Sequence, residues 1–142
     1  MLKKIIKYIA IFLAGGIVYM TLEVLWREYT HWTMGVVGGI CCILIGLINE
    51  ILPKDTPLLV QAPLASIIIT SLEYISGYVL NIKLGLNIWD YSHMPLNVDG
   101  QVCLPASILW MFVGLIGVLL DDWVRSTFFG ESNFKHKLIY KR

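Results

Sequence analysis

The chain has 142 residues, of which 57% are hydrophobic and only 15% are charged. Soluble domains average about 45–50% apolar and about 25% charged residues, so this composition excludes an ordinary water-soluble domain. We expect the chain to lie in a lipid bilayer, and we expect no nucleic-acid partner.

Four apolar stretches follow one another along the chain. Residues 29–49 and 100–120 contain no Asp, Glu, Lys or Arg, and residues 8–26 and 58–82 each contain a single acidic residue. Each stretch is close to or above the roughly 20 residues with which a helix crosses about 30 Å of hydrocarbon. We therefore predict an all-α fold, a polytopic four-transmembrane-helix bundle that forms a single integral membrane domain over residues 1–142. The predicted helices cover about residues 5–27, 34–52, 58–82 and 103–124.

The basic residues predict the orientation of this bundle. Four spans place both chain ends on one side of the membrane, together with the short link over residues 53–57. That side would hold nine basic residues, and the opposite side only Arg27 and Lys83. The nine are Lys3, Lys4, Lys7, Lys54, Arg125, Lys135, Lys137, Lys141 and Arg142. Because cytoplasmic segments are enriched in Lys and Arg, we expect both termini, including a tail over residues 125–142, on the cytoplasmic side of a plasma membrane of bacterial type.

Charged residues inside two of the predicted spans mark a candidate site. Glu23 and Arg27 are four residues apart near the outer end of the first helix. Glu73 lies roughly 10 Å inside the outer end of the third helix, at 1.5 Å per residue. A carboxylate at that depth is costly and usually faces a protein interior or a wet cavity. We predict Glu73 as a proton- or cation-responsive group and Arg27 as an anion contact, with a structural inter-helix hydrogen bond as the alternative role for the acids.

Two further sets of polar and small residues have predicted roles. Glu73 shares one face of the third helix with Ala62, Ser66, Thr70 and Gly77. A second set, at the predicted cytoplasmic boundary, comprises Asn49, Glu50, Asp121 and Asp122. We expect the carboxylates of this second set to pair with nearby lysines and arginines, which are Lys4, Lys7, Lys54 and Arg125.

The connection over residues 83–102 is too polar to span the membrane and too apolar for a free loop. We predict a partly re-entrant or lid-like loop between the third and fourth helices, because irregular backbone at that depth must be covered by protein or line a wet cavity. Its candidate binding residues are Trp89, Asp90, Tyr91, His93 and Asn97. The chain shows no metal-ligand spacing and no recognised catalytic signature, so we predict no metal site and no cofactor, and we assign no catalytic residue.

The stretch over residues 72–110, LEYISGYVLNIKLGLNIWDYSHMPLNVDGQVCLPASILW, resembles a bacterial family labelled "Putative ABC-transporter type IV" (CmpB-like, formerly a family of unknown function). The resemblance lies in an acid–aromatic pair, a W-D-Y-S-x-x-P-x-N-x-x-G run and a following helix that opens towards a tryptophan. The residues that match are Glu73, Trp89, Asp90, Tyr91, Pro95, Asn97, Gly100 and Trp110. Glu23 is similar to the acid of the family's first helix. The resemblance implies a membrane protein linked to transport.

Three functional hypotheses follow. The favoured one is a transport-related or small-solute-binding protein, with an outward-facing polar site under the loop. The second is a structural, regulatory or assembly protein of the membrane. The third is a membrane-embedded enzyme acting on a lipid-like substrate through acid–base groups drawn from Glu23, Glu73, Asp90 and His93, and we favour a protein that is not an enzyme.

Partner chains belong to the favoured hypothesis. The chain has no G-x-x-x-x-G-K-[ST] phosphate-binding loop, so ATP-driven transport would need a partner ATPase subunit. A homo-oligomer or partner membrane subunits would enclose the pathway. Small residues that allow close helix contacts are expected at such an interface, and the candidates are Gly35, Gly39, Gly114 and Gly117.

Overall fold

The computed structural model describes residues 1–53 and 55–131, and it confirms the predicted all-α class. Four helices are long and apolar enough to cross a membrane, and the described residues contain no strand beyond one isolated bridge, between Val98 and Val102. The elements are α1 (Leu2–Arg27), α2 (Trp32–Ile51), α3 (Leu58–Gly77), the π-helix η1 (Tyr78–Lys83) that continues α3, and α4 (Leu104–Phe129).

The helix ends differ from the predicted ranges by up to five residues. The largest difference is at α4, which runs to Phe129 and so includes the first five residues of the predicted tail. The helix ends there because Gly130 adopts a left-handed conformation with φ of 66°. Residues 132–142 of that tail lie outside the described part of the chain.

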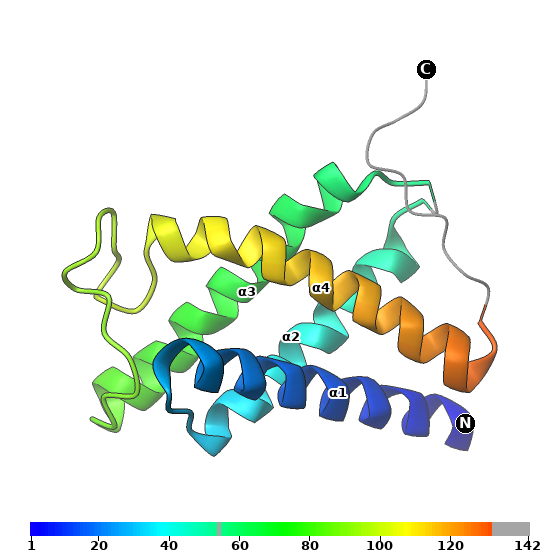
Figure 1. Ribbon diagram of the computed structural model, residues 1–142, viewed down its shortest axis with the longest axis horizontal. Coiled ribbons are helices and arrows are strands. Elements are labelled where there is room, and N and C mark those ends of the chain that lie inside the picture. The colour runs from blue at the N-terminus through cyan, green and yellow to red at the C-terminus, as the bar shows by residue number, and fades with distance from the viewer. Residues whose placement is uncertain (54, 132–142) are drawn as a thin grey trace.

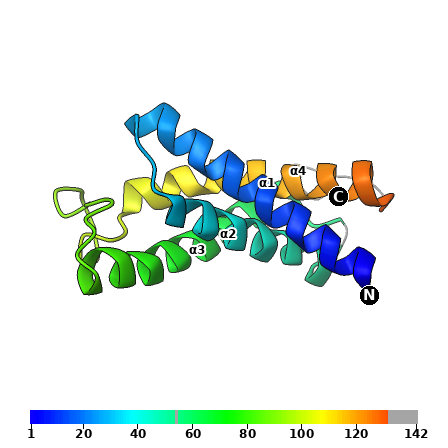
Figure 2. The same ribbon diagram turned by 90° about the horizontal axis from the view of Figure 1, so that it is seen from below.

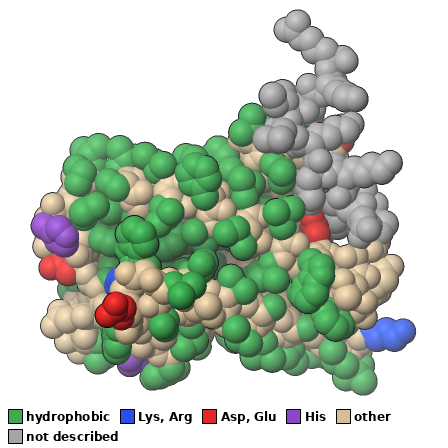
Figure 3. Space-filling model, in the orientation of Figure 1, with side chains coloured by type: hydrophobic (Ala, Val, Ile, Leu, Met, Phe, Trp, Pro, Cys, Tyr) green, Lys and Arg blue, Asp and Glu red, His purple; other side chains and the backbone are tan. Residues whose placement is uncertain are grey.

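The bundle has two distinct ends. In both ribbon views the N-terminus lies beside the end of α4, and the connection between η1 and α4 lies at the opposite extreme of the molecule (Figures 1 and 2). We call these the terminal end and the loop end. Hydrophobic side chains cover much of the face that Figure 3 shows between them, as expected for a multi-pass membrane protein.

The helices pack mainly as two pairs, α1 with α2 and α3 with α4. Glycines bring the first pair into near backbone contact, since a Cβ atom on Gly16 would lie 2.6 Å from the carbonyl oxygen of Gly35. In the second pair the hydroxyls of Ser66 and Thr70 bond Ser107 of α4, at 2.5 Å to its carbonyl oxygen and 2.9 Å to its hydroxyl. The predicted polar face of the third helix is therefore directed at α4.

The four glycines expected at contacts between chains lie at contacts within this chain. A Cβ atom on Gly35 would meet Met20, one on Gly39 would meet Phe12, and one on Gly114 would meet Ala65. Gly117 faces Ile45. These positions allow close packing inside the bundle, and the expected contacts with another chain stay a prediction.

Candidate functional site

The loop between η1 and α4 is tied to the bundle by the side chain of Asn81. This buried amide lies in the π-helix and donates to the carbonyl oxygen of Trp89 at 3.1 Å and to Gln101 Oε1 at 2.9 Å. Its Oδ1 accepts from the backbone N–H of Ile88 at 2.7 Å. Trp89 is itself buried and donates from Nε1 to the carbonyl oxygen of Gln101 at 2.9 Å. Trp89 therefore anchors the loop.

Asp90 and Asn97 shape the backbone of the loop. Asp90 Oδ1 accepts from the backbone N–H of Ser92 at 2.8 Å, and this bond lowers the pKa of the Asp90 carboxyl. Asn97 donates to the carbonyl oxygen of Met94 at 2.9 Å and accepts from the N–H of Gly100 at 3.1 Å. Gly100 has φ of 67°, a conformation that glycine adopts without strain. Much of the W-D-Y-S-x-x-P-x-N-x-x-G run therefore builds the loop itself.

Glu73 lies beneath this loop with its carboxylate held by two aromatic side chains. The side chain of Tyr91 donates its O–H to Oε1 at 3.1 Å, and Trp110 of α4 donates its Nε1–H to Oε2 at 2.8 Å. Glu73 is only 4% exposed. Within the described part of the chain it forms no ion pair with a lysine or an arginine, so both of its partners are neutral.

Tyr91 links Glu73 to the loop as well as to the site. Its backbone N–H donates to the carbonyl oxygen of Gly100 at 2.7 Å, which fixes the start of the turn. Burial raises the pKa of the Tyr91 phenol, and the nearby Glu73 charge raises it further. The phenol therefore stays protonated and remains a donor to Glu73.

Glu23 forms an ion pair near the C-terminal end of α1. Its Oε1 accepts from Arg27 Nη2 at 2.5 Å, and its Oε2 accepts from the hydroxyl of Thr30 at 2.9 Å. Arg27 also donates from Nη1 to the carbonyl oxygen of Ile88 at 3.4 Å, which connects α1 to the loop. Three N–H donors of the guanidinium remain available to another acceptor.

A cavity of about 230 Å³ lies between α1 and α4 at the loop end. Its polar lining includes the Glu23–Arg27 pair, and four aromatic side chains complete much of the wall. These are Tyr19, Trp26, Tyr91 and Trp110. Tyr19 and Trp110 are stacked, with ring centroids 5.9 Å apart. Glu73 lies behind this wall and is near enough to Glu23 and Arg27 for their charges to interact.

The predicted binding residues thus divide by position. Glu23, Arg27 and Tyr91 line the cavity, and Glu73 bonds two of its aromatic walls. Trp89, Asp90 and Asn97, which build the loop, do not line it. His93 is exposed on the loop. None of the hydrogen bonds among the described residues joins Asp90 or His93 to the two helical acids.

Sequence reasoning gave no role in the site to the aromatic residues Tyr19, Trp26 and Trp110 of the cavity, or to Asn81 and Gln101 of the loop anchor. Tyr19 precedes Glu23 by four residues and so shares its helix face, and Trp110 follows Ser107 by three on the face of α4 that meets α3. Both spacings were visible in the sequence. Asn81 and Gln101 carried no comparable signal, because they bond each other and backbone groups of a loop whose path hydropathy does not predict.

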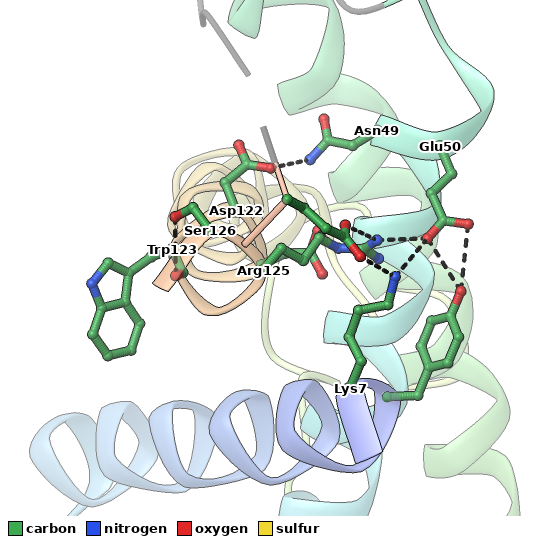
Figure 4. Close-up of polar contacts among 10 residues, drawn as sticks. Lys7, Asn49, Glu50, Asp122, Trp123, Arg125 and Ser126 are labelled. Carbon is green, nitrogen blue, oxygen red and sulfur yellow. Dashed lines mark hydrogen bonds and ion pairs between the residues drawn. The ribbon is translucent and has the colours of Figure 1, made fainter. Parts of the chain in front are cut away.

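A second polar network lies at the terminal end. Arg125 of α4 donates to Asp121 Oδ2 at 2.7 Å and to Glu50 Oε1 at 2.6 Å, and Lys7 of α1 donates to Glu131 Oε1 at 2.7 Å. Figure 4 shows the side chains of Lys7 and Glu50 directed towards Arg125, together with the bond from Asn49 to Asp122. These bonds are of the kind that the sequence predicted at this boundary, with Lys7 and Arg125 as the cations.

The network compensates its charges. Asp121 and Arg125 are 0% and 2% exposed, and their mutual bond neutralises a pair that would otherwise be costly to bury. Partial burial opposes ionisation of Glu131, but the bonds from Lys7 and Arg125 lower the pKa of this carboxyl. This end of the bundle has the character of a structural clamp that joins α1, α2 and α4.

Comparison with known proteins gives one match. The model of a protein family described as "Putative ABC-transporter type IV" matches residues 10–139. The search of curated proteins gave no match to the chain, and the search of solved structures gave none either. The matched range contains all four helices for most of their length, the loop and every residue of the cavity.

Proposed function

This chain belongs to the Putative ABC-transporter type IV family, and from that membership and the geometry of the loop end we propose that it is a transport-related protein that binds a small solute in the cavity between α1 and α4. Glu23, Arg27 and Tyr91 would contact the solute. Glu73 would act through the two aromatic walls that it holds. With the termini cytoplasmic, as the basic residues predict, the cavity would face the outer half of the membrane.

The observation that carries the proposal is a buried acid next to a cavity, and this acid has no cationic partner among residues 1–53 and 55–131. A charged group inside a membrane protein normally pairs or faces a wet space. Arg125 meets this rule with two carboxylates within 2.7 Å, whereas the nearest partners of Glu73 are a phenol and an indole. The charge of the Glu73 carboxylate would therefore interact with a ligand that enters the cavity, as expected of a binding site and not of a structural ion pair.

Glu73→Gln tests this role while keeping the local structure. The glutamine amide oxygen can accept from the Trp110 N–H, which can only donate. The amide nitrogen can donate to the Tyr91 hydroxyl, which can also accept. Both bonds of Glu73 are therefore preserved and only the charge is lost. Asp99→Asn is the matched control, because this loop carboxylate accepts from Tyr74 at 2.8 Å, does not line the cavity, and loses the same charge on substitution.

The experiment is an unbiased solute screen. The purified chain in maltoside micelles is dialysed against a mixture of small organic cations, anions, zwitterions and neutral solutes, and retained compounds are identified by mass spectrometry. We expect the wild type and Asp99→Asn to retain the same solute and Glu73→Gln to lose it, with all three proteins melting at similar temperatures. Retention of nothing by the wild type, or equal retention by Glu73→Gln, would contradict the proposal.

A structural role is the second candidate, and the loop itself favours it. Trp89, Asp90 and Asn97 all bond groups of the loop or its anchor, so this end of the protein is extensively braced. Under this role Glu73 would serve only to hold Tyr91 and Trp110. Replacement by leucine would then lower the melting temperature sharply, glutamine would leave it unchanged, and neither variant would alter solute retention.

A further inference from the structure

We propose that the ligand of the cavity between α1 and α4 carries an alkylated ammonium group, the chemistry shared by choline-type solutes and choline lipid headgroups. This inference rests on the proposed function and names the class of solute that the same site would take. It depends on the charge balance of the cavity, the nature of its walls and its access route.

The charge balance leaves room for one monovalent cation. Glu23 and Arg27 neutralise each other through their direct ion pair. Glu73 adds one more acidic group, which has no cationic partner in the described part of the chain. When all three groups are ionised, the set carries one net negative charge. A ligand with a single positive charge would make the region neutral, whereas an anion would add to the imbalance.

The walls select the kind of cation. Alkylated ammonium groups bind over aromatic faces, because their methyl groups are apolar and the ring faces carry negative potential. Four aromatic side chains line the cavity, and two of them, Tyr91 and Trp110, donate hydrogen bonds to the Glu73 carboxylate. A carboxylate at the edge of a ring pushes electron density towards its faces, since hydrogen bonds polarise the groups that they join. Glu73 would thus strengthen cation binding without touching the ligand.

A ligand would reach the cavity from the exposed side of α1 and α4, near the surface of the membrane. The cavity is lined by residues of α1 and α4 together with Tyr91 of the loop. Its rim includes Trp26, 81% exposed, and Leu109, 46% exposed. A tryptophan so placed is typical of the headgroup region of a bilayer. Both a free solute at the membrane surface and the headgroup of a lipid could reach the cavity by this route.

Arg27 would accommodate an anionic group attached to the ammonium. Its guanidinium bonds Glu23 and the carbonyl oxygen of Ile88 and retains further N–H donors, and its side chain is 29% exposed. Zwitterionic ligands such as glycine betaine or a phosphocholine group carry both charges. In such ligands the ammonium group would balance the negative charge of Glu73, and the anionic group would meet the guanidinium of Arg27.

The test compares choline with dimethylbutanol, its neutral carbon isostere of nearly the same shape. Binding to the purified full chain is measured by isothermal titration calorimetry in maltoside, a detergent without an ammonium group. We expect choline to bind, dimethylbutanol to bind at least about tenfold more weakly, and Glu73→Gln to weaken choline binding about tenfold. Asp99→Asn, which removes a loop charge outside the cavity, should bind choline like the wild type.

A second arm identifies the source of the ammonium group. The protein is placed in phosphatidylglycerol nanodiscs that contain a minor share of phosphatidylcholine, and bound lipid is counted by native mass spectrometry for the wild type and Glu73→Gln. Enrichment of phosphatidylcholine that Glu73→Gln abolishes supports a lipid headgroup, and choline binding in micelles without such enrichment supports a free solute. Either result supports the inference.

Three results would overturn it. Equal binding of choline and dimethylbutanol would show that shape and apolar contact decide, and equal choline binding by Glu73→Gln would remove the role of its charge. Absence of binding by both choline and phosphatidylcholine would exclude this class. The solute screen separates these failures from failure of the proposed function, since a neutral or anionic compound retained there in a manner dependent on Glu73 would leave the binding site in place.

Discussion

Substitution of Gly46 by alanine should disrupt the clamp at the terminal end. Gly46 lies on α2 and faces the carboxyl group of Asp121 on α4. An added Cβ would lie 2.6 Å from Asp121 Cγ and 2.9 Å from its Oδ2, and closer still to its Oδ1. Asp121 is fully buried and cannot retreat into solvent, so its carboxyl must turn away from Arg125.

The magnitude follows from two costs and one gain. Forcing a methyl group into a packed core costs about 1–3 kcal/mol, and breaking a buried ion pair costs up to about 3–5 kcal/mol. Arg125 keeps its bond to Glu50, so breaking its ion pair with Asp121 should cost about 3 kcal/mol or less. Alanine favours the helix by about 1 kcal/mol over glycine. We expect a net loss of about 3 kcal/mol in the free energy of unfolding, or a melting temperature lower by about 10 °C.

Three buried free cysteines provide the assay. Cys41, Cys42 and Cys103 become reactive towards a thiol-specific fluorescent dye only when the bundle opens. Gly117→Ala is the matched control on the same helix contact, because its Cβ would meet only two methyl groups of the Ile45 side chain, at 3.3 and 3.7 Å. It should melt within a few degrees of the wild type.

A double variant tests the assigned cause. If the clash with Asp121 is responsible, Gly46→Ala combined with Asp121→Ala should lose less stability than the two single variants together, since the alanine at position 121 leaves room for the new methyl group. Additive losses would refute the reasoning, and so would wild-type melting of Gly46→Ala.

The loop supports three further predictions. Gly100→Ala should destabilise the loop by about 1–2 kcal/mol, because residue 100 has a positive φ and an added Cβ would lie 2.9 Å from Asp90 Oδ1. Faster hydrogen exchange of the loop amides would show this loss, and unchanged exchange would contradict it. Asn81→Leu removes three hydrogen bonds and should cost about 3 kcal/mol, measured as the shift in thermal unfolding, and a loss below about 1 kcal/mol would mean that the anchor lies elsewhere. The Ser92 N–H lowers the pKa of Asp90, so the contribution of this carboxylate to loop stability is present above its unfolded pKa of about 4 and is lost as the pH falls through the lower folded value. Protection of the Ser92 amide from hydrogen exchange should therefore decrease over that pH range in the wild type. In Asp90→Asn it should not change with pH.

The spans were predictable because hydropathy acts over whole helices, but their ends depend on single contacts. The acidic pair at residues 121–122 and Arg125 suggested a membrane boundary and an early end to the fourth helix. In the structure α4 continues through them, because Arg125 finds carboxylate partners on its own helix and on α2. The π-helical turn after Gly77 has no hydropathy signature, yet it directs the amide of Asn81 towards the loop.

The candidate site was predictable in position and less so in chemistry. Depth in the membrane identified Glu23 and Glu73, and spacing identified Arg27, since these depend only on helix geometry. The neutral partners of Glu73 could not be read from the sequence, because Trp110 lies 37 residues away on another helix. The loop residues share one motif but have different tasks, and only the folded path shows that Tyr91 faces the acid while Trp89 turns inwards.

The two ends of the bundle solve the same electrostatic problem differently, and this contrast bears on the function. At the terminal end, Arg125 and Lys7 come within ion-pair distance of Asp121, Glu50 and Glu131, so each of these carboxylates is paired with a cation of the protein itself. At the loop end, Glu73 is nearly as buried, and its bonding partners in the described part of the chain are two neutral donors, Tyr91 and Trp110. A purely structural role does not require an acid at this position, because an uncharged residue would hold the same helices without the cost of burying a charge. An acid that exchanges a proton or responds to a bound cation must not be paired permanently with a lysine or an arginine. A ligand cation would approach Glu73 through the cavity beside Tyr91 and Trp110.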